Sequence, residues 1–164
     1  MSLSATTNFG VTRLLKRRLQ QFGCVQLTSH GVSMYPFIKA GDKCLFKAVE
    51  PNGLSEGDVI LYRTVDDNLV GHRVVQIICD QQEVLYLCKG DANRYPDPPI
   101  PFGNVLARLV VVQRRQKTIY LDSNIRRLWS WAVLRMPLVS RACRWTIIQQ
   151  QIWRTRLQTL KTRS

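Results

Sequence analysis

The sequence predicts a mainly β protein, a partly closed, antiparallel, barrel-like sheet with amphipathic helices on either side. Between residues 24 and 122 the chain contains seven short β-rich runs with no helical run among them, which is typical of antiparallel β architecture. Turn-forming sequences separate these runs. On both sides of this region, apolar residues recur at helical spacing. With 45% apolar and 21% charged residues, the 164-residue chain has the composition of one globular domain.

The first predicted element is an amphipathic helix over residues 11–22. Its apolar positions follow the helical period and alternate with basic side chains; they are Val11, Leu14, Leu15, Leu19 and Phe22. We therefore assign residues 1–23 to a basic N-terminal helix. The same segment lacks the continuous apolar run of a secretory signal.

The central predicted domain, residues 24–122, contains the β-rich runs at 24–29, 43–49, 57–64, 68–79, 83–90, 105–113 and 118–122. Turn signals lie at residues 51–53, 66–68 and 80–82. The segment ANRYPDPPIPFG (residues 92–103) contains four prolines. We expect it to form an irregular loop over the sheet, because proline cannot donate to a strand ladder or continue a helix.

The last predicted segment, residues 123–164, is a basic helical tail. It contains all four tryptophans, nine basic residues and no acidic residue. Three interpretations remain open: the apolar face packs on the β domain, the tail contacts an anionic membrane surface, or it makes non-specific contacts with nucleic-acid phosphates. A specific nucleic-acid partner is not expected, since no recognised nucleic-acid motif is present.

Charge, cysteines and hydropathy limit where the protein works. The net charge of +13 lies in the two flanks, because residues 42–122 contain ten basic and eleven acidic side chains. The five cysteines form no CxxC pair and lie mostly in apolar runs (Cys44, Cys79 and Cys88), so we expect small hydrophobes rather than disulfides or a zinc site. Without a predicted transmembrane helix or secretory signal, we expect a cytoplasmic or peripherally membrane-associated protein.

Three short segments suggest a catalytic site. Ser33 lies in GVSMYPFIKAGD (residues 31–42), His72 in GHRVVQI (71–77), and Asp91 and Asp97 in KGDANRYPD (89–97). A serine hydroxyl becomes a nucleophile when a neutral imidazole accepts its proton, and a carboxylate on the other ring nitrogen holds the imidazole in place. Backbone N–H groups of the turn around the serine can stabilise the oxyanion. These segments predict a serine–histidine–aspartate hydrolase.

Each of these residues also has a purely structural interpretation. A serine in a loop is ordinarily a turn hydroxyl, a histidine in an apolar strand is ordinarily a core residue, and an aspartate after glycine ordinarily bonds nearby backbone N–H groups. The joint occurrence of the segments in order favours the catalytic interpretation. Asp42 and Asp58 are expected to be structural turn residues, and His30 lies too near Ser33 along the backbone to serve as its base.

Four segments resemble the conserved boxes of the type I signal peptidase superfamily, which also includes the self-cleaving LexA-like repressors. The matching segments are Ser33-Met34-Tyr35-Pro36, Gly57-Asp58-Val59-Ile60, Gly71-His72-Arg73-Val74 and Lys89-Gly90-Asp91-Ala92-Asn93. The resemblance covers roughly residues 24–115. It is closer to the serine–histidine branch of archaeal and endoplasmic-reticulum signal peptidases than to the lysine branch, because His72 stands where a lysine would act. Lys39, Lys43 and Lys89 are expected to be solvated.

The resemblance implies a serine endopeptidase domain over residues 24–122 with a β-rich, barrel-like fold. It implies Ser33 as nucleophile and His72 as general base, with Asp97, or else Asp91, orienting the imidazole. The substrate would be an extended leader or signal-like peptide with small side chains before the cleaved bond, and no metal or organic cofactor would be needed. The sequence departs from the family pattern at Ala92, in lacking an anchor helix and in its basic tail. It resembles the small anchorless bacterial members of the superfamily more than a housekeeping signal peptidase.

Two other functions remain compatible with the sequence. One is a non-catalytic peptide-binding module on the same fold, whose function Ser33→Ala would leave unchanged. The other is a membrane-surface or nucleic-acid binding protein that acts through residues 123–164.

Overall fold

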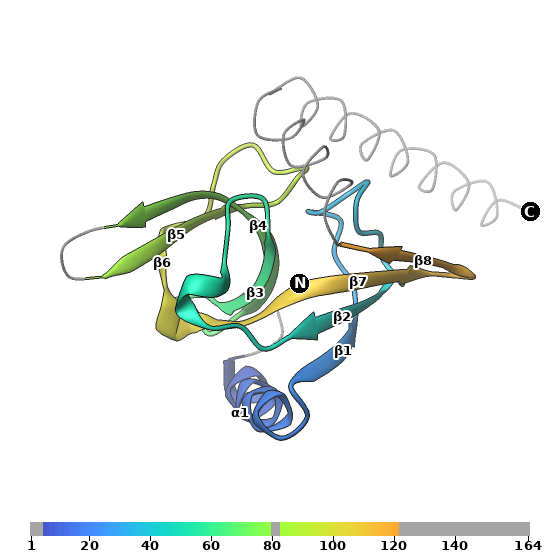
Figure 1. Ribbon diagram of the computed structural model, residues 1–164, viewed down its shortest axis with the longest axis horizontal. Helices are drawn as coiled ribbons and strands as arrows, with labels where there is room; N and C mark the ends of the chain where they lie inside the picture. The colour runs from blue at the N-terminus through green and yellow to red at the C-terminus, as the bar shows by residue number, and fades with distance from the viewer. Residues whose placement is uncertain (1–4, 80–82, 122–164) are drawn as a thin grey trace, which may run out of the picture.

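The computed structural model describes residues 5–79 and 83–121. Within them, one helix, α1 (Ala5–Phe22), precedes a single antiparallel sheet (Figure 1). Its strands are β1 (Cys24–Thr28), β2 (Lys43–Lys47), β3 (Val59–Arg63), β4 (Leu69–Cys79), β5 (Val84–Lys89), β6 (Ile100–Pro101), β7 (Val105–Arg114) and β8 (Lys117–Tyr120). Two single-turn 3-10 helices, η1 (Pro51–Gly53) and η2 (Phe102–Asn104), lie between strands.

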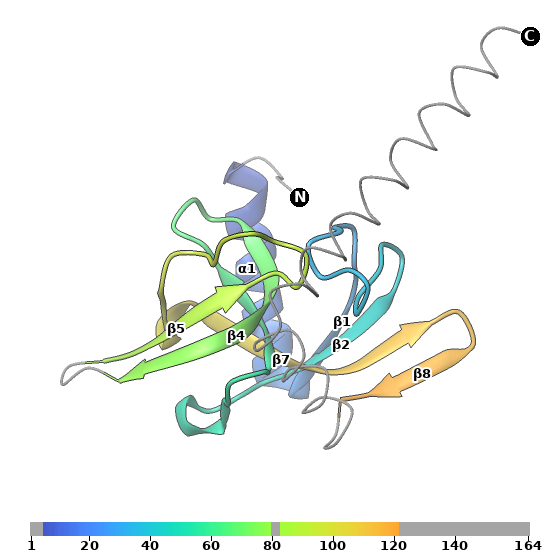
Figure 2. The same cartoon turned by 90° about the horizontal axis from the view of Figure 1, so that it is seen from above.

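The eight strands form one open sheet. Their spatial order is β1-β2-β7-β3-β4-β5-β6, with β8 paired to β7 as a hairpin that projects from the body (Figure 2). Strand β7 pairs with β2 along one part of its length and with β3 along another. The predicted mainly antiparallel β class is confirmed, whereas the predicted partial closure into a barrel is wrong. Closure needs paired edges, and the edge strand β6 has only two residues, of which Pro101 has no N–H to donate.

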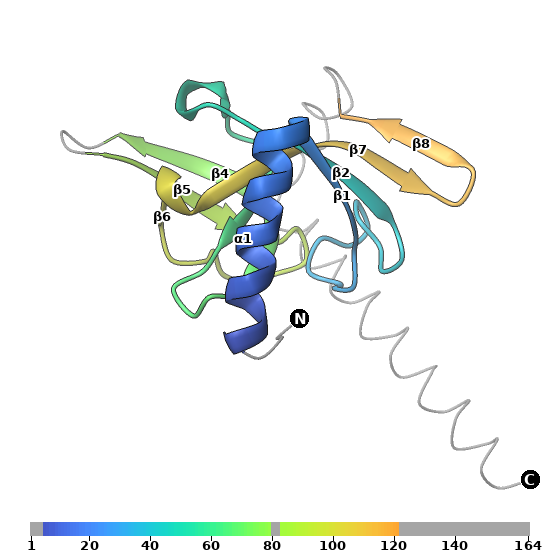
Figure 3. The same ribbon diagram turned by 90° about the horizontal axis from the view of Figure 1, so that it is seen from below.

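Helix α1 lies across one face of the sheet and packs against β1 and β7 (Figure 3). Its buried side chains Leu15 and Leu19 enter the core. The helix ends at Phe22 and is followed by Gly23, whose φ of +70° suits the left-handed position after a helix C-terminus. The predicted helix over 11–22 is confirmed, and it begins earlier, at Ala5. The sequence missed that first part because the segment ATTNFG has no apolar period.

Strand β3 separates two apolar clusters. Successive side chains of a strand point to opposite faces, and here Val59 and Leu61 enter the first cluster, whereas Ile60 and Tyr62 enter the second. All four are buried. The first cluster lies between α1, β2, β7 and the loop after β1, and the second lies against β4, β5 and β6.

All seven predicted β-rich runs form strands within a few residues of their expected bounds. The predicted irregular segment 92–103 is correct for its first part but wrong at its end, where Ile100–Pro101 forms β6 and η2 begins at Phe102. Proline is tolerated there because β6 is an edge strand. The predicted basic tail, residues 123–164, lies outside the described residues. In the described part of the chain, no helix is both long and apolar enough to span a membrane.

Candidate active site

Ser33 lies in the loop that joins β1 to β2. The neighbouring side chains Met34 and Ile38 are buried in the first apolar cluster and anchor the loop. The turn is closed by two backbone bonds, in which Tyr35 N–H donates to the carbonyl of Val32 at 3.0 Å and Ile38 N–H donates to that of Met34 at 2.9 Å. Because Met34 enters the core, Ser33 stays half-buried and reaches the molecular surface.

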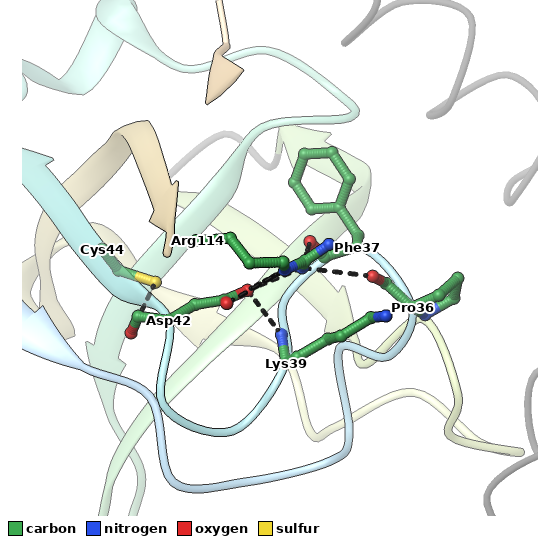
Figure 4. A network of polar contacts seen from close by, with 6 residues as sticks. All are labelled: Pro36, Phe37, Lys39, Asp42, Cys44 and Arg114. Carbon is green, nitrogen blue, oxygen red and sulfur yellow. Dashed lines mark hydrogen bonds and ion pairs between the residues drawn. The ribbon is translucent and has the colours of Figure 1, made fainter. Parts of the chain in front are cut away.

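The second half of this loop is held by Arg114, at the end of β7 (Figure 4). Its guanidinium donates to both carboxylate oxygens of Asp42, with a shortest distance of 2.6 Å from Nη2 to Oδ2. The same Nη2 donates to the carbonyl of Phe37 at 2.9 Å. Asp42 Oδ2 also accepts the backbone N–H of Lys39 at 2.8 Å. These bonds join the loop that follows Ser33 to the end of β7, an interior strand of the sheet.

A second loop contacts Ser33 from the end of β5. The backbone N–H of Ala92 donates to the carbonyl oxygen of Ser33 at 2.8 Å. Gly90 lies so close to the same oxygen that a Cβ there would approach it to 2.8 Å. The Lys-Gly-Asp segment and the serine segment, distant in sequence, therefore form one local structure.

His72 lies in β4 with its side chain directed at the serine. Its Nε2 is 2.9 Å from Ser33 Oγ, within hydrogen-bond distance. The register pairs His72 with Ile60 of β3, and only 7% of the residue is exposed. The imidazole is thus fixed on a central strand, while Ser33 lies on a loop anchored by core side chains.

Asp97 completes the arrangement from the proline-rich loop. Its Oδ2 is 2.6 Å from His72 Nδ1 and accepts a hydrogen bond from the Tyr62 hydroxyl at 2.7 Å. Burial acts to raise the pKa of Asp97, but the hydrogen bond and charge of His72 and the hydroxyl of Tyr62 outweigh burial and lower it. Asp97 N–H donates to the carbonyl of Cys88 at 2.7 Å, which fixes the loop to β5. Asp97 therefore stays a carboxylate near neutral pH.

Asp91, the other predicted partner of His72, instead pairs with Arg73. Arg73 Nε and Nη2 donate to its two carboxylate oxygens, each at 2.8 Å, and both side chains are 0% exposed. Arg73 also donates to the carbonyl of Gly57 at 2.8 Å and lies 4.8 Å from the centre of the Phe37 ring. The structure therefore places Asp91 in a buried ion pair with Arg73, whereas Asp97 is the aspartate that contacts His72.

The remaining polar residues named from the sequence are turn residues or are at least partly exposed. Asp42 and Asp58 are turn residues as expected, since each accepts the backbone N–H of the residue three positions earlier in the chain. His30, Lys39 and Lys43 are exposed and Lys89 is half-buried. The Nζ of Lys39 lies 5.5 Å from the centre of the Tyr35 ring.

The described cysteines are not equivalent. Cys44 and Cys88 are buried, as expected for small hydrophobes, whereas Cys79 is exposed at the end of β4, contrary to the expectation from its apolar run. Its strand extends beyond the core into the β4–β5 hairpin, which explains the difference (Figure 2). Among the residues that the structure describes, no group of three or more His, Cys, Asp or Glu side chains is placed to hold a metal ion.

Sequence reasoning missed three residues that build the site. They are Tyr62, which lies in an apolar run, Arg73, which follows His72 in its segment, and Arg114, which lies just beyond the predicted run 105–113. The alternation of β3 and β4 predicts faces for Tyr62 and Arg73, but their partners depend on strand register. No local pattern indicates that Arg114 reaches Asp42.

Comparisons with models of known protein families and with curated proteins give no match for this chain.

Proposed function

We propose that this protein is a serine endopeptidase of the signal-peptidase type, with Ser33 as nucleophile, His72 as general base and Asp97 as the carboxylate that orients His72. The supporting observation is the continuous series of contacts from Ser33 Oγ to His72 Nε2 at 2.9 Å and from His72 Nδ1 to Asp97 Oδ2 at 2.6 Å. This is the geometry that activates a serine hydroxyl on unrelated folds.

In the proposed acylation step, the Ser33 hydroxyl transfers its proton to His72 Nε2 while Oγ attacks the carbonyl carbon of the peptide. The negative charge moves to the carbonyl oxygen, where backbone N–H groups of the serine turn stabilise it. The carbon–nitrogen bond then breaks, and the leaving amine takes the proton from Nε2. The product is an acyl ester on Ser33.

In the proposed deacylation step, water gives a proton to His72 Nε2 and attacks the ester carbon. The carbon–oxygen bond to Ser33 breaks, and Oγ recovers the proton from the imidazole. His72 is an imidazolium in each half-reaction, and the anionic Asp97 stabilises that charge. The lowered pKa of Asp97 supports this role because it keeps the carboxyl group ionised.

The resemblance to the signal peptidase superfamily supports the substrate class. In sequence order, the serine, histidine and Lys-Gly-Asp boxes supply Ser33, His72 and the loop that leads to Asp97, and these groups are neighbours in space. We propose on this basis that the sheet is the β-rich fold of that superfamily. The substrate is then an extended leader or signal-like peptide with small side chains before the cleaved bond.

The test combines a covalent probe with peptide cleavage. A fluorophosphonate, which esterifies activated serine hydroxyls, is expected to label the full-length protein at Ser33 and to inhibit cleavage of leader peptides. Ser33→Ala and His72→Ala are expected to lower cleavage by at least about a thousandfold, as loss of a nucleophile or base does in serine hydrolases. Ser55→Ala, at an exposed serine in another turn, serves as the control and is expected to leave cleavage unchanged.

Folding of each variant is checked by its thermal unfolding transition. Cleavage that persists in both Ser33→Ala and His72→Ala would exclude the proposed mechanism. Binding of leader peptides that is equal in wild type and Ser33→Ala, without any cleavage, would favour the non-catalytic peptide-binding module instead.

A further inference from the structure

We propose that Tyr62 is a positioning residue of this site, which holds the Asp97 carboxylate against His72 and thereby fixes the proton on Nδ1 of the imidazole. The inference deepens the proposed function and rests on it for its catalytic consequence. Its structural part, the ordering of Asp97 and His72 by a hydroxyl from β3, is measurable in the absence of any substrate.

The geometry centres on one oxygen atom. Asp97 Oδ2 lies 2.7 Å from the Tyr62 hydroxyl and 2.6 Å from His72 Nδ1. The hydroxyl is also 3.4 Å from Nδ1, and the two rings meet edge to face with centroids 6.4 Å apart. Tyr62 and His72 lie on adjacent paired strands, two positions out of direct register, so the rigid β3–β4 pair sets their separation.

The tautomer of His72 follows from counting protons. The Tyr62 hydroxyl has one proton, and it donates to the anionic Asp97 rather than to the neutral ring nitrogen. Nδ1 faces the same carboxylate oxygen at 2.6 Å, so Nδ1 must itself carry a hydrogen and donate it. In the neutral ring, Nε2 is then unprotonated and faces the Ser33 hydroxyl as an acceptor. This is the tautomer that a general base requires.

The burial of the two partners differs, which explains why the hydroxyl is needed. Tyr62 is 1% exposed and lies in a central strand, whereas the Asp97 side chain is 26% exposed on a proline-rich loop. A carboxylate on such a loop can turn toward water. The hydroxyl opposes that turn, and a buried hydroxyl left without an acceptor would be unfavourable. The bond therefore gives the Tyr62 hydroxyl an acceptor and also holds the Asp97 carboxylate in place.

The Tyr62 hydroxyl and the Cys88 thiol next to this bond stay protonated near neutral pH. Burial, followed by the hydrogen bond and charge of Asp97, raises the pKa of Tyr62 well above its ordinary value, so the hydroxyl remains a donor. Cys88, on β5, also faces Tyr62 and Asp97, and burial followed by the charge of Asp97 raises its pKa to about 12. The thiol is thus neutral, and Asp97 is the anion in this group.

Tyr62→Phe keeps the ring and removes only the hydroxyl. We expect kcat for a leader peptide to fall about tenfold with KM changed by less than about twofold, because Asp97 supports His72 in the transition state rather than substrate binding. In proton NMR spectra of the substrate-free protein, we expect the Nδ1 proton of His72 to exchange with water about tenfold faster. Replacement of Tyr62 by 3-fluorotyrosine keeps the hydroxyl and is expected to retain both wild-type values within about twofold.

The control is Tyr86→Phe, which removes a buried hydroxyl from a tyrosine in the same apolar cluster. It is expected to leave kcat and the exchange of the His72 proton unchanged.

The outcomes of the test separate the inference from the proposed function. If Tyr62→Phe has the kcat of wild type and the same exchange rate of the His72 Nδ1 proton, the inference is overturned, whereas cleavage that depends on Ser33 still supports the proposed function. An absence of Ser33-dependent cleavage in wild type would refute the function, and the exchange rates would then decide the positioning role alone. If Tyr62→Phe does not fold, the 3-fluorotyrosine protein replaces it in the test. Exchange of the His72 Nδ1 proton that is faster there than in wild type would overturn the inference.

Discussion

The carbonyl oxygen of Ser33 lies against Gly90, at a distance of 2.8 Å from the position that a Cβ on Gly90 would occupy. The N–H of Ala92 donates to the same oxygen at 2.8 Å. The loop after β5 thus both touches the main chain of Ser33 and leads to Asp97. The position of Ser33 relative to its proposed partners depends on a glycine in another segment.

Gly90→Ala is expected to lower cleavage at least about tenfold. Its Cβ would also lie 2.9 Å from the side chain of Asn93, so either this loop or the Ser33 turn must shift, and small displacements of reacting groups are costly. We expect a loss of about 1–3 kcal/mol in unfolding free energy, as for other overpacked sites. Gly103→Ala is the matched control, because a Cβ there meets nothing within 4 Å. Equal activities of the two variants would contradict the role assigned to Gly90.

Removing one partner of the Arg73–Asp91 pair is expected to destabilise the fold strongly. Both side chains are 0% exposed, so Arg73→Met or Asp91→Leu leaves a charge buried without its counter-ion and should cost about 3–5 kcal/mol. The double variant is expected to recover a large part of that loss. Urea denaturation of the four proteins measures the coupling. Additive losses in the double variant would show that the pair is not coupled.

The hydrogen bonds of Asp97 are expected to make stability depend on pH. Burial raises the pKa of Asp97, but the hydrogen bond and charge of His72 and the Tyr62 hydroxyl lower it below the ordinary value of 3.8. Because the folded pKa lies below the unfolded one, the unfolded state binds the proton more readily. The ionised group therefore stabilises the fold above about pH 4, and this contribution is lost as the pH falls through the folded pKa.

The measurement for Asp97 compares the unfolding free energies of wild type and Asp97→Asn at pH 7 and pH 3. At pH 7 the unfolding free energy of wild type is expected to exceed that of Asp97→Asn. The difference should shrink at pH 3, where Asp97 takes up a proton and the asparagine cannot. An advantage that is constant or larger at the lower pH would contradict the lowered pKa.

Arg114→Lys is expected to loosen the loop that follows Ser33. Arg114 donates to Asp42 and to the carbonyl of Phe37 simultaneously, and a lysine keeps the charge but not the planar set of donors. We expect a loss of about 1–2 kcal/mol in unfolding free energy together with faster proteolysis within residues 36–42. Gln113→Ala, at the exposed neighbour on β7, is the control. If Arg114→Lys has the same unfolding free energy and the same rate of proteolysis as Gln113→Ala, this role of Arg114 is excluded.

The four described cysteines are expected to differ in reactivity. Burial, with the charge of Asp42 adding to it and that of Arg114 opposing it, raises the pKa of Cys44 to about 11. Burial, followed by the charge of Asp97, raises that of Cys88 to about 12. Since the thiolate is the reactive species, iodoacetamide at pH 7.5 should modify the exposed Cys24 and Cys79 first. Peptide mass spectrometry measures the order in which the four cysteines are modified. Rapid modification of Cys88 in the folded protein would contradict the prediction.

The amino-acid sequence was sufficient to predict most of the local structure. Apolar spacing predicted the buried face of α1, because Leu15 and Leu19 recur at the helical period. Alternation and turn signals predicted seven of the strands. Strand β6 was missed because two residues that include Pro101 have no period of their own. The openness of the sheet was also missed, since pairing between distant strands leaves no local pattern.

The sequence by itself determined which chemical groups are present: Ser33, His72 and two nearby aspartates in ordered segments. The tertiary structure decided which aspartate meets the imidazole. His72 and Arg73 are adjacent in β4 and point to opposite faces of the strand, so the carboxylates separate, with Asp91 on Arg73 and Asp97 on His72. Periodicity along one chain specifies the face of each residue, but the partner across the sheet depends on register and loop paths that only the packed fold fixes.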